Sequence, residues 1–163
     1  MGPLDDLVRR ADSAMVVVTL GSPDGLFGCL VGFHCQVSIE PLRYAVCLSN
    51  ENATLRAAAD VTELGVHLLG RSQLGLAALF GEISADDGVD KFEQCEWDRD
   101  GEGPPILREV PSWFVGTIID RVALGDHTAH LLEPLRYGRG PDEPPLRYHS
   151  TSGFEAGHPP DDD

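Results

Sequence analysis

The amino-acid stretch VVVTLGSPDGLFGCLVGFHCQVSIEP, residues 16–41, carries the strongest signal of the fold. Its first part belongs to MVVVTLG (15–21), a β-branched run that is typical of a buried strand. SPDG (22–25) is a turn signal between strands, and residues 26–38 are predicted to be strand again. Pro41 has no N–H to donate to a sheet, so we expect it at the break before the next strand.

Outward from this stretch, the pattern predicts more strands with short helices between them. The expected strands are 43–48, 64–69, 113–124, 128–135 and 145–149. The expected helices are 4–10, 52–59 capped by Asn52, and a helix capped by Ser72 that runs through Phe80 with Gly81 just past its end. Helices and strands do not alternate regularly, which favours a mostly antiparallel barrel with helical insertions over a doubly wound sheet.

Size and charge limit the classes of function. The chain has 163 residues, 42% of them hydrophobic, and a formal net charge of -15. A single domain over residues 1–154 and a disordered acidic tail over 155–163 are expected. The charge disfavours nucleic acid and anionic membranes as partners. The sequence shows no secretory signal and no apolar run of 18 residues, so we expect a cytoplasmic protein.

The local charge, the cysteines and the spacing of His127 and His130 are interpreted mostly as structural features and do not indicate a metal site. Residues 82–102 carry nine acidic groups against Lys91 and Arg99, which is typical of a solvated surface. No CxxC pair occurs, and the cysteines are read as small buried hydrophobes: Cys29, Cys35, Cys47 and Cys95. His127 and His130 are three apart and would point to opposite faces of a strand, so no metal site is predicted.

The common signatures of catalysis are missing from the sequence. There is no GxxxxGK[ST] phosphate loop, no GxGxxG, no GxSxG and no HExxH. The motifs in the chain therefore do not indicate nucleophilic or metal-dependent catalysis. If the protein is an enzyme, a bound cofactor is expected to supply the chemistry.

The order of the remaining motifs resembles the flavin reductase-like family, whose fold is the FMN-binding split β-barrel. The resemblance covers about residues 12–150. Its motifs are the opening 16–41, which ends in Val37-Ser38-Ile39-Glu40-Pro41; YAVCLSNENATLRAA (44–58); LGVHLLGRSQLGLAALFG (64–81); Asp90-Lys91-Phe92 with Trp97; Gly125-Asp126-His127-Thr128; and Pro145-Leu146-Arg147-Tyr148-His149.

The resemblance implies an NAD(P)H:flavin oxidoreductase with FMN or FAD at a homodimer interface. Hydride would pass from NAD(P)H to the flavin N5, and the reduced flavin would be used in place or by a partner monooxygenase. One alternative is a flavin- or haem-binding carrier or sensor without turnover on the same barrel. A deazaflavin-dependent reductase is the other, although the acidic surface is unfavourable for that cofactor's anionic tail.

In the family, the segment that matches residues 29–36 runs along the edge of the flavin ring. The candidate ring-binding residues are Leu30, Val31, Gly32, His34, Cys35 and Gln36. Four of them, Leu30, Gly32, Cys35 and Gln36, occupy the positions of the family's usual Thr and Ser residues. Backbone amides would therefore make the contacts, and Gly32 would let the ring approach closely. His34 is read either as a stacking partner of the ring or as a histidine at the edge of the core.

The SNENAT loop and the helix after it are the expected site of the flavin phosphate, because a helix N-terminus offers free amides. The candidates are Ser49, Asn50, Asn52, Thr54 and Arg56. From the residues alone, Asn52 is equally well a helix cap and Arg56 a solvated surface residue.

His127 is the candidate catalytic residue. It resembles the family histidine near the flavin and the nicotinamide, where it would orient the hydride donor or stabilise charge on the reduced ring. The alternative is an exposed histidine in a turn. Phe80 and Tyr148 are expected to line the site or simply to pack.

Overall fold

A computed structural model describes residues 2–83, 88–99 and 101–154 of the chain. Within these residues, the strands are β1 (Val16–Ser22), β2 (Gly25–Val31), β3 (His34–Ser38), β4 (Arg43–Ser49), β5 (Glu63–Leu68), β6 (Trp97–Arg99), β7 (Pro105–Leu107), β8 (Ser112–Ala123) and β9 (His127–Arg139). The helices are α1 (Asp5–Ala11), α2 (Ala53–Ala58) and α3 (Leu74–Glu82), with 3-10 turns η2 (Lys91–Glu93) and η3 (Tyr148–Ser150).

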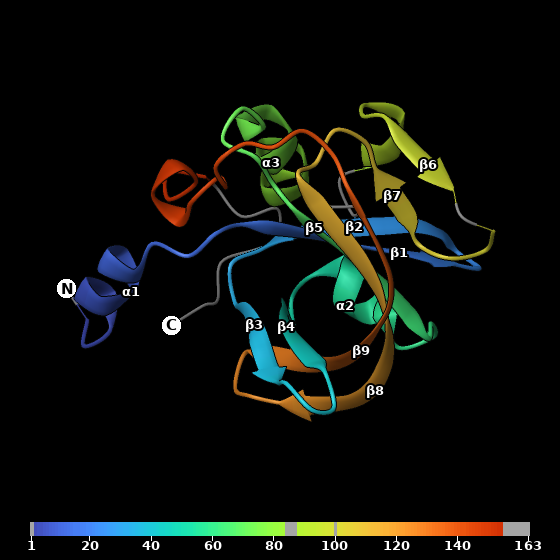
Figure 1. The fold of residues 1–163 in the computed structure, drawn as a ribbon, viewed down its shortest axis with the longest axis horizontal. Helices are drawn as coiled ribbons and strands as arrows, with labels where there is room; N and C mark the ends of the chain where they lie inside the picture. Colours follow the sequence, from blue (N-terminus) through green and yellow to red (C-terminus); the bar gives the residue numbers. More distant parts are fainter. Residues whose placement is uncertain (1, 84–87, 100, 155–163) are drawn as a thin grey trace.

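Seven of the strands form one antiparallel sheet in the order β2-β1-β5-β8-β9-β4-β3. The long strands β8 and β9 curve strongly, which brings β3 and β4 below β1 and β2 (Figure 1). β6 and β7 form a separate hairpin. The predicted fold class, mostly β with short helical insertions, is confirmed.

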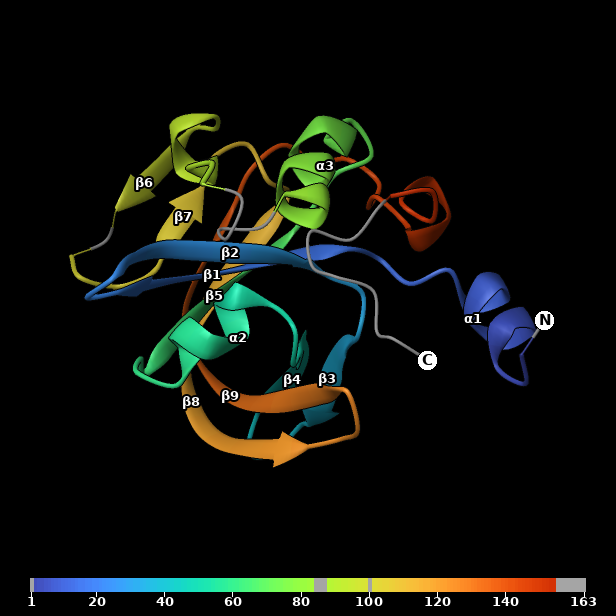
Figure 2. The same ribbon diagram turned by 180° about the vertical axis from the view of Figure 1, so that it is seen from behind.

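The β-branched run of β1 is buried on both faces. Val16, Val18 and Leu20 belong to the core inside the curved sheet, against which α2 packs, whereas Val17 belongs to a second core with Phe80 of α3. Figure 2 shows α2 and α3 on opposite sides of β1 and β2. A strand between two cores needs apolar residues at successive positions, which explains why the run does not alternate.

The predicted strand 26–38 is two strands. β2 ends at Val31, the chain turns at Gly32 and Phe33, and β3 begins at His34. The amide of Cys47 in β4 donates to the carbonyl of Phe33 at 2.9 Å, so the break is fixed by β4. Pro41 lies between β3 and β4 as predicted.

Two other predicted elements differ from the structure. The helix predicted from Ser72 spans Leu74–Glu82, and the Ser72 hydroxyl binds Glu143 instead of capping it. Gly81 lies inside this helix, where a Cβ would come within 2.8 Å of Leu30, so the glycine permits close packing and is not a stop signal. The strand predicted at 145–149 is two isolated bridges followed by η3.

The readings of the cysteines and of the acidic segment were partly wrong. Cys29 is buried, but Cys35 is exposed and Cys47 and Cys95 are half-buried. Within the acidic segment, Lys91 is buried and its ammonium donates to the carbonyl of Gly28 at 3.0 Å. The predicted disordered tail lies outside the described residues.

No helix in the described part of the chain is both long enough and apolar enough to cross a bilayer.

Candidate functional site

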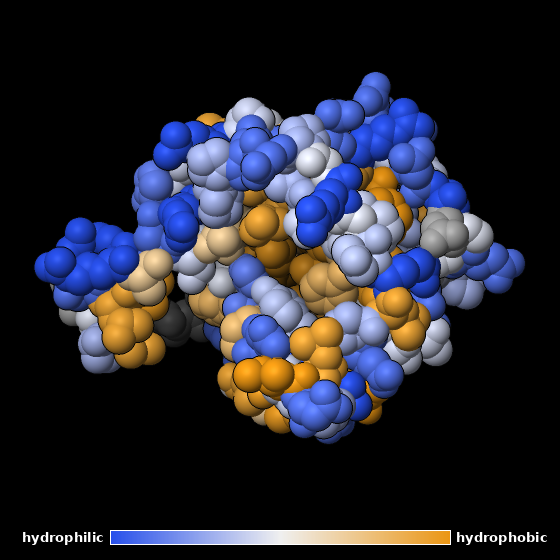
Figure 3. Space-filling model, viewed as in Figure 1, coloured by the Kyte–Doolittle hydropathy of each residue, from blue (hydrophilic) through white to orange (hydrophobic). Residues whose placement is uncertain are grey.

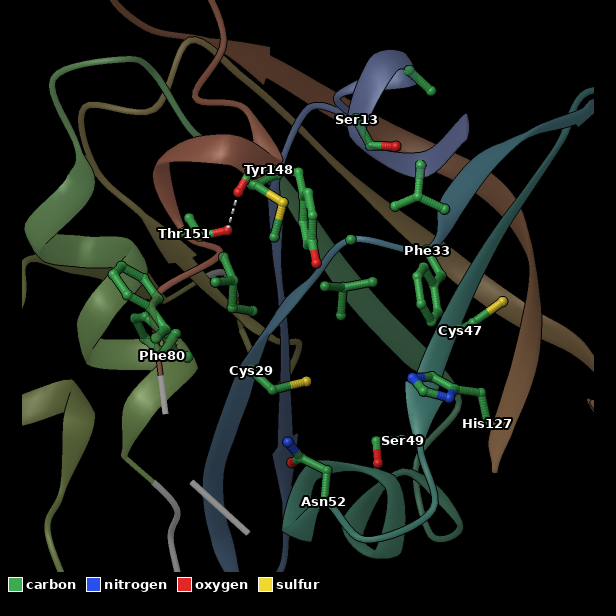
Figure 4. A pocket seen from close by; sticks show the side chains of 18 of the residues that line it. Ser13, Cys29, Phe33, Cys47, Ser49, Asn52, Phe80, His127, Tyr148 and Thr151 are labelled. Atoms are coloured by element: carbon green, nitrogen blue, oxygen red, sulfur yellow. Dashed lines mark hydrogen bonds between the residues drawn. The ribbon is translucent and has the colours of Figure 1, made fainter. Parts of the chain in front are cut away.

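A cavity of about 610 Å³ lies between the edge of the main sheet, α3, η3 and α1. We call it the central cavity. In Figure 4, Phe80 and Thr151 face Phe33 and His127 across it, and Ser49 and Asn52 close its lower end. Its walls therefore come from segments that are far apart in the sequence.

Strand β2 supplies the floor of the central cavity through Cys29, Leu30 and Val31. The residue before them is Gly28, and Phe80 packs directly on the strand at this position. A Cβ on Gly28 would come within 2.7 Å of the Phe80 ring. Gly32, where β2 ends, also lines the cavity, and a Cβ there would meet only Met15 at 3.6 Å or more. This side of the cavity is thus open to a flat ligand at the backbone.

His127 enters the cavity from the first position of β9. Its Nδ1 lies 2.7 Å from Oδ1 of Asp126, and because a carboxylate only accepts, Nδ1 carries the proton. This hydrogen bond lowers the pKa of Asp126. The ring of Phe33 lies 4.8 Å from the imidazole, centroid to centroid. The orientation of His127 is therefore fixed from two sides.

Asn50 stabilises the turn that carries His127 and does not line the central cavity. Its amide nitrogen Nδ2 donates to the carbonyl of Gly125 at 3.1 Å, and its Oδ1 accepts from the Thr128 hydroxyl at 2.8 Å. Gly125 has a φ of 97°, a left-handed conformation that suits glycine. In this structure Asn50 positions the turn, while Ser49 and Asn52 are the residues of the loop that face the cavity.

Asn52 both lines the central cavity and caps α2. Its side chain accepts from the amide of Thr54 at 2.9 Å. Thr54 is buried beside Cys29, whose thiol pKa burial raises to about 11. Arg56 is not among the lining residues, and its guanidinium donates to the carbonyl of Glu51 at 3.4 Å. Thr54 and Arg56 are thus close to the site in sequence but outside its wall.

The β3 residues predicted to contact a flavin ring also lie outside the wall. His34 Nε2 donates to the carbonyl of Ala14 at 2.7 Å, and its Nδ1 accepts from the Tyr44 hydroxyl at 2.6 Å. Both ring nitrogens are therefore used within the fold. Cys35 is exposed, and the Gln36 amide donates to the carbonyl of Ser38.

Phe80 and Tyr148 both line the central cavity. Phe80 is also a core residue, in edge-to-face contact with Phe92. Of the predicted site residues, those that line the central cavity are Leu30, Val31, Gly32, Ser49, Asn52, Phe80, His127 and Tyr148. Those that do not line it are His34, Cys35, Gln36, Asn50, Thr54 and Arg56.

Several wall residues were not predicted from the sequence. Phe33 is 56% exposed and reaches His127, and its place within the family segment 29–36 was the available signal. α1 contributes a wall although none of its residues is buried. No sequence pattern indicates that an N-terminal helix meets η3 near the other end of the chain. Among residues 2–83, 88–99 and 101–154, no cluster of metal-binding side chains is found.

Residues 8–157 match the family described as "Flavin reductase like domain". The match covers most of the chain, so the protein belongs to this family. The predicted resemblance is confirmed.

Named relatives add detail. An NADH:FMN oxidoreductase of Rhodococcus qingshengii is 31% identical over 121 residues, 74% of this chain but 62% of that protein. The reductase component of the flavin-dependent trigonelline monooxygenase of Acinetobacter baylyi is 25% identical, over 71% of this chain and 36% of that protein. A crystal structure of a flavin reductase domain protein from Arthrobacter sp. FB24 has a TM-score of 0.79 at 24% identity, covering 98% of this chain and 96% of that one. The chain thus spans less than two thirds of the length of these two curated relatives.

Proposed function

We propose that the protein is an NAD(P)H-dependent flavin reductase that binds FMN or FAD in the central cavity. The observation that carries the proposal is His127, oriented by Asp126 and Phe33 at the wall of a mostly apolar cavity in a chain of this family. The bound flavin would supply the redox chemistry by taking a hydride at N5 from the nicotinamide.

The chain's own residues would bind and orient the two rings. The floor at Leu30 and Val31 offers an apolar surface, and Gly32 allows a ring to approach the backbone. Phe80, which packs on β2, and Tyr148 of η3 would help to exclude water. Positioning of two stacked rings is the main catalytic demand in such a transfer.

His127 would act through its second nitrogen. Because Nδ1 donates to Asp126, Nε2 of the neutral ring is an acceptor, and protonation at Nε2 would give a donor held in the same place. The imidazole would therefore orient the nicotinamide amide or stabilise negative charge on the reduced ring.

An anaerobic absorption experiment tests this function. The purified protein is mixed with FMN and then with NADH or NADPH, and the visible absorption band of the oxidised flavin is followed. Bleaching that depends on the protein supports a reductase. A flavin or haem band that neither nicotinamide changes would favour the carrier or sensor alternative, and reduction of a deazaflavin but not of FMN would favour the third.

We also propose a homodimer. Apolar side chains are exposed along β3 and the turn after it, at Val37 (51%), Ile39 (83%) and Leu42 (50%). We call these three residues the β3 face. Figure 3 has an apolar area at its lower edge, where Figure 1 shows β3 and β8. Exposed apolar patches of this kind often mark an interface.

A partner monooxygenase and a cytoplasmic location complete the proposal. The Acinetobacter relative is named as the reductase component of a monooxygenase, which supports a similar partner here. Transfer of reduced flavin is tested by adding a flavin-dependent oxygenase of the same genome. The cytoplasmic location stays a prediction that cell fractionation can test.

A further inference from the structure

No cation lines the central cavity. All 12 Lys and Arg residues of the chain lie among the described residues, and none of them is in the wall, where Asp5 is the acidic side chain. FMN, FAD and NAD(P)H all carry phosphate groups. In a chain of net charge -15, any cation that pairs with these phosphates must come from outside the central cavity.

The loop before α2 is a poor source of that charge. The amide of Thr54 already donates to Asn52, and the guanidinium of Arg56 donates to the carbonyl of Glu51. Neither residue lines the cavity.

A second cavity, of about 310 Å³, offers the missing charge. We call it the basic cleft; its wall is Arg71, Pro144, Pro145, Leu146, Arg147, His149 and Ser150. No carboxylate is in this wall. The cleft and the central cavity share one segment, since Tyr148 and Thr151 line the central cavity while their neighbours line the cleft.

The basic side chains of the cleft are attached to a fixed backbone. The amide of Arg71 donates to the carbonyl of Pro144 at 2.8 Å. Arg147 donates to the carbonyl of Asp12 at 3.1 Å, and His149 donates to the Asp12 carboxylate from its amide and its Nδ1. The side chain of Arg147 is therefore held in place, and the backbone that carries Arg71 is fixed, which lowers the entropic cost of binding.

Arg71 is the strongest single indication. Within the part of the chain that the structure describes, its guanidinium makes no hydrogen bond or ion pair. Neither neighbouring carboxylate pairs with Arg71: Glu143 accepts from the Ser72 hydroxyl, and Asp12 accepts from His149 of the cleft wall. An unpaired arginine in the wall of a cavity is suited to a phosphate oxygen.

We propose that the basic cleft is an anion subsite, in which Arg71 and Arg147 hold a phosphate or pyrophosphate of a ligand whose ring lies in the central cavity. The proposal rests on the proposed flavin reductase function. The phosphate belongs either to the nicotinamide dinucleotide or to the flavin nucleotide.

Arg71→Gln is the main test, with Arg139→Gln, an exposed arginine at the end of β9, and Arg56→Gln as matched controls. Inorganic pyrophosphate is the probe. It should raise the melting temperature of the wild type and of both controls, and this shift should be lost in Arg71→Gln. Because this readout needs no turnover, it still tests the subsite if the protein proves not to be a reductase.

Kinetics then identify the source of the phosphate. With phosphate-free riboflavin as acceptor, an increase of about tenfold in KM for NADH in Arg71→Gln, with kcat little changed, assigns the subsite to the dinucleotide. Weaker binding of FMN but not of riboflavin assigns it to the flavin. The proposal is overturned if pyrophosphate stabilises Arg71→Gln as much as the wild type, or if Arg71→Gln changes neither the KM for NADH nor the binding of FMN.

Discussion

At the scale of single residues, His127 is the side chain on which the proposed chemistry depends. His127→Asn removes the ring but leaves a polar side chain near Asp126 and Phe33. We expect hydride transfer to slow by about 10²-fold, the lower end of the range for a positioned acid–base group, while FMN still binds. Anaerobic stopped-flow reduction and a flavin titration measure the two quantities separately.

Asp126→Asn is the companion variant. It keeps a hydrogen-bond acceptor for Nδ1 but removes the negative charge, so we expect a smaller decrease in rate than in His127→Asn. A rate of flavin reduction that is unchanged in His127→Asn would return this histidine to the role of an exposed turn residue.

His67 contributes stability that depends on pH. Its buried ring donates from Nδ1 to the carbonyl of Val17 at 3.0 Å and accepts at Nε2 from the amide of Leu107 at 3.1 Å. Burial lowers the pKa of His67 to about 4, well below the usual value of a histidine in an unfolded chain. The unfolded state therefore binds the proton more readily, and stability falls as the pH drops from about 6.5 to about 4.

The whole loss from this group amounts to about 3 kcal/mol. Urea unfolding of the wild type at pH 7 and at pH 4.5 should show most of it. His67→Gln, which cannot be protonated, should be less stable at pH 7 but should lose less stability on acidification. Equal losses in the two proteins would mean that other groups cause the acid sensitivity.

At the scale of elements, Asn52 has two possible roles at the start of α2: it caps the helix, and it could contact a ligand. The side chain caps the helix and also faces the central cavity. Asn52→Ala should cost about 1 kcal/mol of unfolding free energy through loss of the cap. Asn52→Ser keeps a capping oxygen, so it should restore most of that stability.

Ligand binding distinguishes the two roles. If the amide of Asn52 also contacts the flavin, the Ser variant should be stable and yet bind FMN more weakly than the wild type, as measured by flavin fluorescence. Wild-type FMN affinity in Asn52→Ser would make the residue a helix cap only.

Elements were predictable wherever local chemistry decides them. The β-branched run of β1, the turn at Pro23 and Asp24 and the cap at Asn52 all follow from the residues involved. The errors occur where distant contacts decide. Ser72 binds Glu143, which is far along the chain, and the segment at 145–149 pairs with Ala14 and Gly70 through single bridges.

The same reason limits prediction of the site. Leu30, Val31, Gly32 and His127 were named as candidates because they lie within the motifs of the family, and all four line the central cavity. The position of His34 was not, since its contacts with Ala14 and Tyr44 depend on how β1, β3 and β4 pack. The wall formed by α1 likewise depends on a meeting of the two ends of the described chain.

At the scale of the whole molecule, net charge and the β3 face act against each other in assembly. Each protomer carries a formal charge of -15, so two copies repel. Burial of exposed side chains such as Ile39 favours association at roughly 25 cal/mol per Å² of apolar surface. Because salt shortens the range of the repulsion to about 8 Å at physiological ionic strength, we expect dimerisation to strengthen as salt is added.

The double variant Val37→Glu/Ile39→Glu should be a monomer at micromolar concentration and at 0.15 M salt, about the physiological ionic strength, because it places two charges where apolar contact is needed. Tyr137→Glu is the matched control, since Tyr137 is also apolar and 77% exposed but lies on β9, away from the β3 face. Light scattering after size exclusion measures the mass, and circular dichroism checks that each variant folds.

Phe33 of the central cavity is close in sequence to the β3 face, so a dimer contact there would also help to shield the cavity from water. The monomeric variant should therefore bind FMN more weakly. A wild type that stays monomeric at every salt concentration would contradict the proposed dimer and leave the central cavity to function within a single chain.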